Sequence, residues 1–417
     1  MSPEVARQKK KSTDEHKKKY TSQYAVKTLD KGHVALLLPL SGPLSRYARE
    51  IAAALEISFQ NNAIPYLVYD TGQEGLSISD HVRDAKKAGS FFVLGALGNQ
   101  EAKRMRKAAL IEGMAIGLLA PMSPPRVAFK HIYYLWPSPE WEASQSAYAA
   151  KELGFEHVGF LSSRDSLGLR QRGAFERAFG ENEEAQFDAG HYDPESRTLE
   201  SDLRSFFRLT PSMNASFRRH VGRYGKAGWK TYTPDDLTMD LLYIADGVGR
   251  GALVASFLPY LNIVPRNSSI MNQVGLRGRY GGKIPALVQV FGSFGWNKRD
   301  LSVRGGEATE GALVLTMCPP HDETIPETFQ KSFIRPFEKK RGRPPSRTAK
   351  IAYDVAEFVS MAASRHLSAR SKTRVLTLEG GLKEGVCGPA RLKKSGELER
   401  QVSLFRASGG GFDLEPW

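Results

Sequence analysis

VALLLPLSGPLSRYAREIAAALEIS, residues 34–58, carries the pattern of a buried strand, a tight loop and an amphipathic helix. Val34–Leu38 form a continuous apolar run that ends at Pro39, which is typical of a parallel strand buried on both faces. Residues 41–43 then supply the start signals of a helix. Apolar side chains recur after them at helical spacing, at Leu44, Ala48, Ile51 and Leu55. The loop between this strand and this helix is therefore expected at the carboxyl edge of a sheet, where α/β proteins bind ligands.

Strand-like and helix-like patterns alternate through most of the remaining chain. Short apolar runs predict strands at 64–69, 91–94, 116–120, 132–136, 158–161, 185–189, 241–245 and 286–291. Helical patterns lie between them, for example at Glu101–Ile111, where Asn99 is positioned to cap the helix. Alternation at this spacing implies right-handed βαβ units and parallel sheets. The predicted fold class is therefore α/β.

The opening stretch also resembles that of type I periplasmic binding proteins, the leucine/isoleucine/valine-binding family. In that family a strand ending in Pro-Leu-Thr/Ser-Gly leads into the first helix, and further matches follow here in the family's order over residues 31–415. The resemblance implies two Rossmann-like lobes joined by a multi-strand hinge. It predicts a basic flexible arm at 1–30, a first lobe from 31–137 with 316–380, and a second lobe from 138–315 with 381–417.

Composition indicates a globular protein with a basic surface. Hydrophobic residues make up 41% of the 417 residues, and 59 Lys and Arg against 45 Asp and Glu give a net charge of +14. Such a charge favours nucleic acid, an anionic membrane surface or an anionic wall polymer as a partner, without naming one, and a merely solvated basic surface is an equal alternative.

Residues 211–234 interrupt the alternation of strands and helices. Cationic side chains stand there among glycines and aromatics, namely Arg218, Arg219, His220, Arg223, Lys226 and Lys230. We interpret the segment as a basic surface insertion. A mobile loop and a docking site for an acidic partner are both consistent with it.

Two cysteines, Cys318 and Cys387, exclude a disulfide scaffold and a Cys-rich zinc site. They would pair only in an oxidising compartment. No apolar run reaches the roughly 18 residues of a membrane span, and the N-terminus lacks the apolar core of a signal peptide. If Met1 is the true start, a cytoplasmic location is expected. If an export signal is missing from this sequence, the periplasm or cell envelope is expected.

Two motifs suggest nucleotide or DNA binding, and each has a structural alternative. Gly247–Ala252 form a GxGxxA pattern, but no acidic residue that would bind a ribose occurs before Asp300. Arg341–Pro344 copy the core of an AT-hook, yet lie between two predicted helices and match a Gly-Arg-x-Pro-Ser turn of the resembled family. Nucleic acid and nucleotide cofactors are therefore disfavoured.

Other catalytic signatures are missing from the sequence. It holds no GxSxG elbow, no HExxH motif and no P-loop, and its nine histidines are not at metal-ligand spacing. We therefore expect a protein that is not an enzyme and uses no metal and no cofactor.

The resemblance also predicts where a ligand would lie. In amino-acid-binding members, a serine and a threonine from two first-lobe loops hold the ligand's carboxylate and amino groups, and second-lobe tyrosine and acidic residues close over it. The corresponding loops are Leu97–Gln100 and Pro121–Pro124. Gly98 or Asn99 stands where serine is expected, and Pro124 where threonine is expected. The amino-acid clamp is thus degraded.

The second-lobe candidate is Asp246, at the end of its strand. It would either accept a ligand ammonium or hydroxyl group or merely cap the following helix. The predicted ligand-binding set is Ser41, Gly98, Asn99, Ser123 and Asp246. Tyr47 and Trp296 are secondary candidates that fit the hydrophobic core equally well.

One branch of the family fits these departures. Penicillin-binding-protein activators share the fold, have different cleft residues and act by touching a peptidoglycan synthase; residues 241–246 and 292–297 resemble that branch. The predicted function is a non-catalytic cell-envelope binding protein that acts by lobe closure on a small molecule or as a partner of a peptidoglycan synthase. The alternatives are a solute-binding protein of an ABC transporter for amino acids, with a membrane permease as partner, and a cytosolic ligand sensor.

Overall fold

The computed structural model describes residues 32–417 except 181–184, 194–197, 235–236, 267–274, 276, 279–281, 283–284, 299, 321–323 and 370–374. The predicted basic arm at 1–30 lies outside the described residues. The chain divides into two compact units. Unit 1 consists of Met1–Ser138 and His321–Gln401, and unit 2 of Pro139–Pro320 and Val402–Trp417. The chain therefore passes between the units three times.

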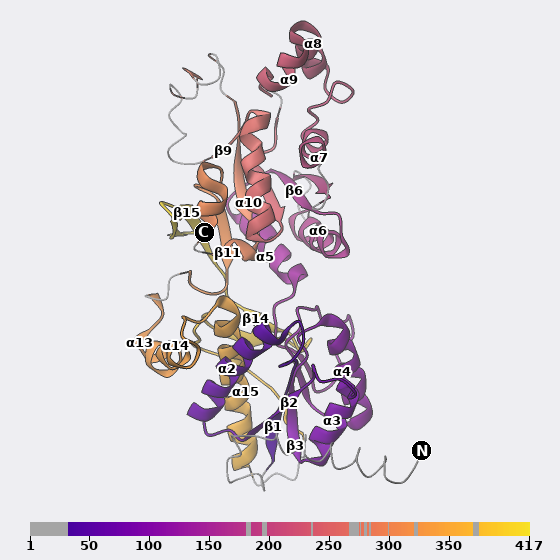
Figure 1. Cartoon of the computed structure of the whole chain (residues 1–417), viewed down its shortest axis with the longest axis vertical. Helices are drawn as coiled ribbons and strands as arrows, with labels where there is room; N and C mark the ends of the chain where they lie inside the picture. Colours follow the sequence, from indigo (N-terminus) through magenta and orange to yellow (C-terminus); the bar gives the residue numbers. More distant parts are fainter. Residues whose placement is uncertain are drawn as a thin grey trace. The chain divides into compact units, whose positions relative to one another are not determined.

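Unit 1 contains a five-stranded parallel sheet with the order β2-β1-β3-β4-β5. Figure 1 labels its strands β1, β2 and β3. The strands are β1 (His33–Leu38), β2 (Tyr66–Asp70), β3 (Ser90–Gly95), β4 (Ile116–Leu118) and β5 (Ile132–Tyr134). All six residues of β1 are buried, which explains its continuous apolar run. All five strands end at the same edge of the sheet, so the loops that follow them gather there.

Helices cover this sheet. They are α2 (Ser45–Asn61), α3 (Ile78–Lys87), α4 (Asn99–Glu112), α13 (Glu327–Phe329), the π-helical η7 (Gln330–Ile334), α14 (Arg335–Arg341) and α15 (Arg347–Ser368). Helix α2 packs against α15, and α3 packs against α4. Apolar residues of α3 and α4 join one face of β1 in a single core cluster that includes Leu37, Val82 and Met105.

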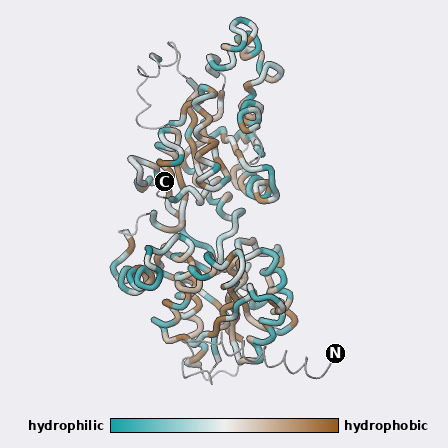
Figure 2. Tube along the Cα trace, in the orientation of Figure 1, coloured by the Kyte–Doolittle hydropathy of each residue, from teal (hydrophilic) through white to brown (hydrophobic). Residues whose placement is uncertain are grey.

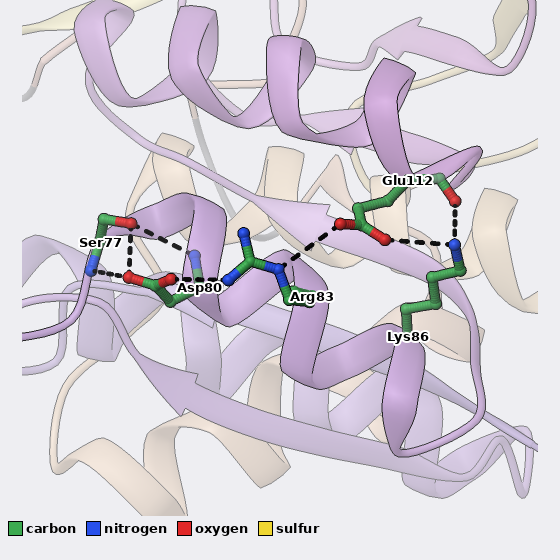
Figure 3. A network of polar contacts seen from close by, with 5 residues as sticks. All are labelled: Ser77, Asp80, Arg83, Lys86 and Glu112. Carbon is green, nitrogen blue, oxygen red and sulfur yellow. Dashed lines mark hydrogen bonds and ion pairs between the residues drawn. The ribbon is translucent and has the colours of Figure 1, made fainter.

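Polar contacts fix α3 and the end of α4 on the surface of unit 1 (Figure 3). Ser77 and Asp80 form a capping box at the start of α3, with a hydroxyl-to-carboxylate distance of 2.7 Å. Arg83 pairs with both Asp80 and Glu112, and Lys86 lies 3.2 Å from the Glu112 carboxylate. Because these pairs are largely exposed, each contributes little to the stability of the fold.

Unit 2 is organised in the same way around a second sheet. Its order is β16-β15-β11-β10-β8-β6-β7, with β9 beside β10. The strands are β6 (His157–Ser163), β7 (Gln186–Tyr192), β8 (Leu241–Ala245), β9 (Ile263–Pro265), β10 (Ala286–Gly292), β11 (Leu313–Thr316), β15 (Ser403–Ser408) and β16 (Gly411–Glu415). Pairing is parallel from β7 to β11, and β15 and β16 add an antiparallel edge.

The helical segments of unit 2 complete an α/β architecture. They are α5 (Pro139–Glu152), α6 (Ser166–Phe179), α7 (Leu199–Phe206), α8 (Ala215–Tyr224), η2 (Gly225–Ala227), α9 (Gly228–Thr231), α10 (Val248–Phe257), η3 (Leu258–Leu261), η4 (Phe294–Trp296), α12 (Leu301–Gly305) and η5 (Gly306–Ala308). The predicted α/β class with parallel sheets is confirmed for both units. No helix among the described residues is long and apolar enough to cross a membrane.

The assignment of residues 381–401 to the second lobe is wrong. They form the three-stranded sheet of β12 (Gly381–Leu382), β13 (Ala390–Leu392) and β14 (Leu398–Arg400), and belong to unit 1. Arg400, the last residue of β14, is buried against Asp354 of α15 and fastens the segment there. Residues 316–320, predicted in the first lobe, belong to unit 2.

The structure also places Asn99, the AT-hook-like segment and the two secondary site candidates. Asn99 does not cap α4, because the capping position is Gly98 and Asn99 is the first helical residue. The AT-hook-like segment is a turn in which Gly342 has a φ of 68°, and Arg343 pairs with Glu50 at 2.9 Å. Trp296 is fully buried in the core of unit 2, and Tyr47 is 37% exposed.

Burial of His33 at the start of β1 predicts acid sensitivity. The side chain is buried, its Nε2 lies 2.7 Å from the Ser90 hydroxyl, and burial lowers its pKa to about 4. Between pH 6.5 and 4 the unfolded chain binds a proton at His33 that the folded chain does not, so stability is lost as pH falls through this window. The loss is about 3 kcal/mol when complete.

We therefore expect His33→Gln to remove this contribution. Urea unfolding of both proteins at pH 7.5, 5.5 and 4.5 measures the slope, and the difference in unfolding free energy between them should shift in favour of the variant as pH falls. Parallel pH profiles for the two proteins would contradict the assignment to His33.

Candidate functional site

The loop after β1 is fastened to the loop after β2 at the carboxyl edge of unit 1. The backbone N–H of Ser41 donates to Asp70 Oδ1 at 3.1 Å, and the N–H of Gly72 donates to the same oxygen at 2.9 Å. A Cβ at Gly72 would overlap the Ser41 carbonyl, so the close approach of the two loops requires glycine there. The Ser41 hydroxyl oxygen is buried and has no hydrogen-bond partner among the described residues.

The loop after β3 carries two predicted site residues. Ala96 precedes them with a φ of 53°, a left-handed conformation that is costly for alanine. Gly98 then occupies the capping position of α4, and a Cβ there would overlap the Glu101 carboxylate. The Asn99 Oδ1 atom is buried without a hydrogen-bond partner in the described part of the chain.

Ser123, in the loop after β4, is already engaged. Its hydroxyl donates to the Ser138 hydroxyl at 3.0 Å. Ser138 is buried and is the last residue of the first chain segment of unit 1. This contact ties the loop after β4 to the segment that follows β5, and gives Ser123 a structural role whether or not a ligand binds.

Asp246, the predicted residue of unit 2, follows β8 and has partners on both carboxylate oxygens. Tyr192, the last residue of β7, donates its hydroxyl to Oδ2 at 2.6 Å, and the Gly247 N–H donates to Oδ1 at 2.6 Å. The Asp246 carbonyl accepts from the Ser293 hydroxyl at 2.7 Å and from Trp296 Nε1 at 3.1 Å. The carboxyl ends of β7, β8 and β10 are thereby joined in one polar network.

The pKa values of two residues at this edge of the unit 2 sheet are shifted. Burial raises the pKa of Tyr192 far above its usual range, and the hydrogen bond to Asp246 adds to that effect. Asp165, which caps α6 after β6, has its pKa lowered chiefly by the hydrogen bond from the Gly168 N–H. The Tyr192 phenol is therefore neutral at physiological pH and keeps the hydrogen that it donates to Asp246.

The structure brings the predicted residues to two places. Ser41, Gly98, Asn99 and Ser123 lie in loops at one edge of the unit 1 sheet, and Asp246 lies at the corresponding edge of unit 2. Sequence reasoning missed Asp70, Glu101 and Tyr192. Strand β7 was predicted to end at residue 189, three residues before Tyr192. The acidic residues at the end of β2 and in the first turn of α4 were signals that could have found the other two.

A separate cavity of about 620 Å³ lies at the opposite edge of the unit 2 sheet. Asp188 and Thr238 flank His157 there, each at 2.8 Å from one ring nitrogen. Arg208, with a φ of 55°, also lines the cavity. In the described part of the chain, no group of three or more histidine, cysteine, aspartate or glutamate side chains is arranged to hold a metal ion.

Comparison with known sequences gives two matches. A family model described as "LppC putative lipoprotein" matches residues 18–250. The penicillin-binding protein activator LpoA of Pasteurella multocida (strain Pm70) is 32% identical over 144 residues, which are 34% of this chain and 24% of that protein. The matched region thus spans about a quarter of the length of this curated relative.

Solved structures show the same fold at low identity. The LpoA (YraM) C-domain from Haemophilus influenzae, described as a regulator of PBP1A, gives a TM-score of 0.61 at 18% identity and covers 92% of this chain and 100% of that domain. The leucine-binding protein LivK of Thermotoga maritima MSB8 gives 0.55 at 15% identity, covering 92% and 98%. The fold predicted from residues 34–58, that of type I periplasmic binding proteins, is confirmed.

Proposed function

The chain belongs to the LppC family of putative lipoproteins, and from this membership we propose that it is a non-catalytic cell-envelope protein that activates a peptidoglycan synthase by binding it. Its similarity to LpoA of Pasteurella multocida supports the same function. The partner is then a penicillin-binding protein, and the protein's effect is on the rate of the partner's reaction.

One observation favours activation of a synthase over transport of a small molecule. Glu101 places its carboxylate beside Gly98, at the N-terminus of α4, where the resembled amino-acid binders use a serine to hold a ligand carboxylate. A carboxylate already at that helix end repels a second one and takes the favourable end of the helix dipole. The Glu101 carboxylate thus occupies the position that a ligand carboxylate takes in the amino-acid binders.

The cysteines support a location in the cell envelope. Both Cys318 and Cys387 are disulfide-bonded, and neither is a free thiol. Structural disulfides persist in oxidising compartments such as the periplasm and are rare in the cytosol. This observation favours the envelope alternative over a cytosolic sensor.

The test is a rate measurement with a purified class A penicillin-binding protein from the same organism. We expect glycan polymerisation or peptide cross-linking to accelerate when the protein is added in excess. Glu101→Gln is the control for a ligand-mediated effect, because removing this charge should leave activation unchanged if no small molecule is involved. An unchanged rate together with no detectable binding would overturn the proposal.

A second candidate is a solute-binding protein of an ABC transporter, and two unpartnered polar atoms favour it. The Ser41 hydroxyl and Asn99 Oδ1 both lie at the ligand edge of unit 1 without a hydrogen-bond partner in the described residues. Melting temperatures with amino acids, short peptides, sugars and wall fragments test this candidate. A ligand at a hundredfold excess over its dissociation constant stabilises by about 2.7 kcal/mol. No shift across the panel would exclude these solutes.

A further inference from the structure

The basic insertion is a packed helical element of unit 2. Asn214 caps α8 by accepting a hydrogen bond from the Phe217 N–H at 2.8 Å. The Phe217 ring is 1% exposed and packs edge-to-face against Trp229 and Tyr232, at centroid distances of 5.1 and 5.0 Å. Arg204 of α7 lies over the Trp229 ring at 5.4 Å. Residues 215–231 are therefore anchored to unit 2 by buried aromatic contacts and carry helical segments, unlike an irregular loop.

Five cationic side chains are exposed on this element, and Figure 2 colours much of it as hydrophilic. We name it the α8–α9 basic face, and its members are the exposed residues Arg218, Arg219, Arg223, Lys226 and Lys230. The sequence contains no Asp or Glu from Leu203 to Pro234. Among the residues that the structure describes, none of the five members forms an ion pair, whereas Arg204 and Arg208 have carboxylate partners.

Like charges on this face repel one another. Arg219 and Arg223 stand four residues apart on α8, which places them side by side, and Lys226 and Lys230 have the same separation beyond it. Solvent and salt screen part of this repulsion. A partner that brings carboxylates to the face offsets the repulsion that screening leaves. The carboxylates also form charge-assisted hydrogen bonds with the planar guanidinium groups.

We propose that the α8–α9 basic face docks an acidic surface of the protein partner, and this rests on the proposed function as an activator of a peptidoglycan synthase. Arginine and tyrosine are enriched in protein–protein interfaces. Tyr224, at the end of α8, is 53% exposed, with the Arg223 guanidinium 6.0 Å from its ring centroid. The face thus combines charge for steering with an aromatic side chain for contact.

The composition of the face favours a protein over a membrane. A helix that lies on a membrane inserts an apolar side into the lipid. The apolar residues of α8 are used internally, since Phe217 is buried and Val221 packs against the core of unit 2. The exposed residues of α8 are Arg218, Arg219, Gly222 and Arg223, with Ala215 and Tyr224 at its two ends. The exposed side therefore has no continuous apolar stripe.

The experiment compares two triple variants of the full chain. Arg218→Gln/Arg219→Gln/Arg223→Gln neutralises three cations of the basic face. Lys103→Gln/Arg104→Gln/Lys107→Gln removes the same charge from α4 of unit 1, where these residues are also exposed and outside any ion pair of the described residues. Glutamine is a good helix former, so both variants should keep the wild-type melting temperature.

Binding to the immobilised periplasmic region of the synthase is measured at 50 and 300 mM salt. We expect the α8 variant to raise the dissociation constant about tenfold at 50 mM salt, mainly by slowing association, with a smaller effect at 300 mM. The α4 variant should bind like the wild type. This pattern supports the proposal.

Other outcomes overturn it and separate it from the proposed function. If the wild type binds the synthase and both variants bind equally well, the basic face is not the docking site, whereas the activator function stands. If the two variants weaken binding to the synthase equally, the net positive charge of the protein is responsible and not the basic face. If the wild type fails to bind at all, the activator function fails, and the proposal with it. Binding to phosphatidylglycerol vesicles that depends on α8, without binding to the synthase, would assign the face to a membrane.

Discussion

Arg400→Leu is expected to destabilise unit 1 by about 3–5 kcal/mol, because it leaves a buried carboxylate without its cation. The side chains of Arg400 and Asp354 are 1% and 0% exposed, and the guanidinium lies 3.1 Å from Asp354 Oδ2. Asp354 also accepts the backbone N–H groups of Val386 and Cys387 at 2.7 and 2.9 Å. Thermal and urea unfolding measure the loss.

The pH dependence of the loss identifies its cause. Burial raises the pKa of Asp354 to about 6 even with Arg400 present. Without the guanidinium the folded-state pKa rises further, so the variant holds a proton that the unfolded chain has released. Its stability therefore falls as pH rises through that pKa, and the deficit relative to wild type should be larger at pH 8 than at pH 5.

Two companion variants test this interpretation. Lys393→Met breaks the exposed pair with Glu399, whose side chains are 42% and 37% exposed, and should cost less than about 1 kcal/mol. Asp354→Asn in the Arg400→Leu background should remove the pH dependence of the loss, since the buried charge is gone. It should not restore the full stability, because the single amide oxygen replaces only one of the two carboxylate oxygens that accept the Val386 and Cys387 N–H groups. Equal losses for Arg400→Leu and Lys393→Met would show that burial of the pair is unimportant.

The same pair explains which part of the fold could not be predicted from the sequence. Local patterns predicted most strands and helices of the two sheets, because elements such as the apolar run at Val34–Leu38 and the helical stripe of α15 carry their own periodicity. Strand β9 and helices α3 and α8 were not predicted. The placement of residues 381–401 depends on one long-range contact between Arg400 and Asp354. In the sequence these are two charged residues among many, and nothing local announces that both are buried.

The candidate site was predictable as a set of loops and not as a set of contacts. Parallel strands place their carboxyl ends at one edge, so Ser41, Asn99 and Asp246 were predicted from that topology together with the family resemblance. Their hydrogen-bond partners were missed because residues at the ends of two neighbouring strands are separated by no fixed number of positions in the sequence. Tyr192 reaches Asp246 across 54 positions of the chain. Gly98 was recognised as a departure from the resembled family, but the carboxylate of Glu101 beside it appears only in three dimensions.

Trp296→Ala is expected to destabilise unit 2 by about 3–5 kcal/mol and to loosen the loop that carries Asp246. The indole is fully buried, and its Nε1–H donates to the Asp246 carbonyl at 3.1 Å. Removing it leaves a cavity beneath that loop. Trp296→Phe keeps most of the ring and loses the hydrogen bond, at a cost of about 1 kcal/mol. Trp417→Ala is the matched control, since Trp417 is 46% exposed and should change stability by less than about 0.5 kcal/mol.

A glycine beside the indole gives this prediction its sharpest test. A Cβ at Gly292 would overlap the Trp296 ring, so Gly292→Ala should destabilise the wild type by about 1–3 kcal/mol through overpacking. In the Trp296→Ala background the added methyl group enters the empty space, and the same change should be neutral or stabilising. The two losses are then strongly non-additive, as expected for side chains in contact. Additive losses would mean that the indole does not lie against Gly292. The Trp296 indole would then not support the loop that carries Asp246.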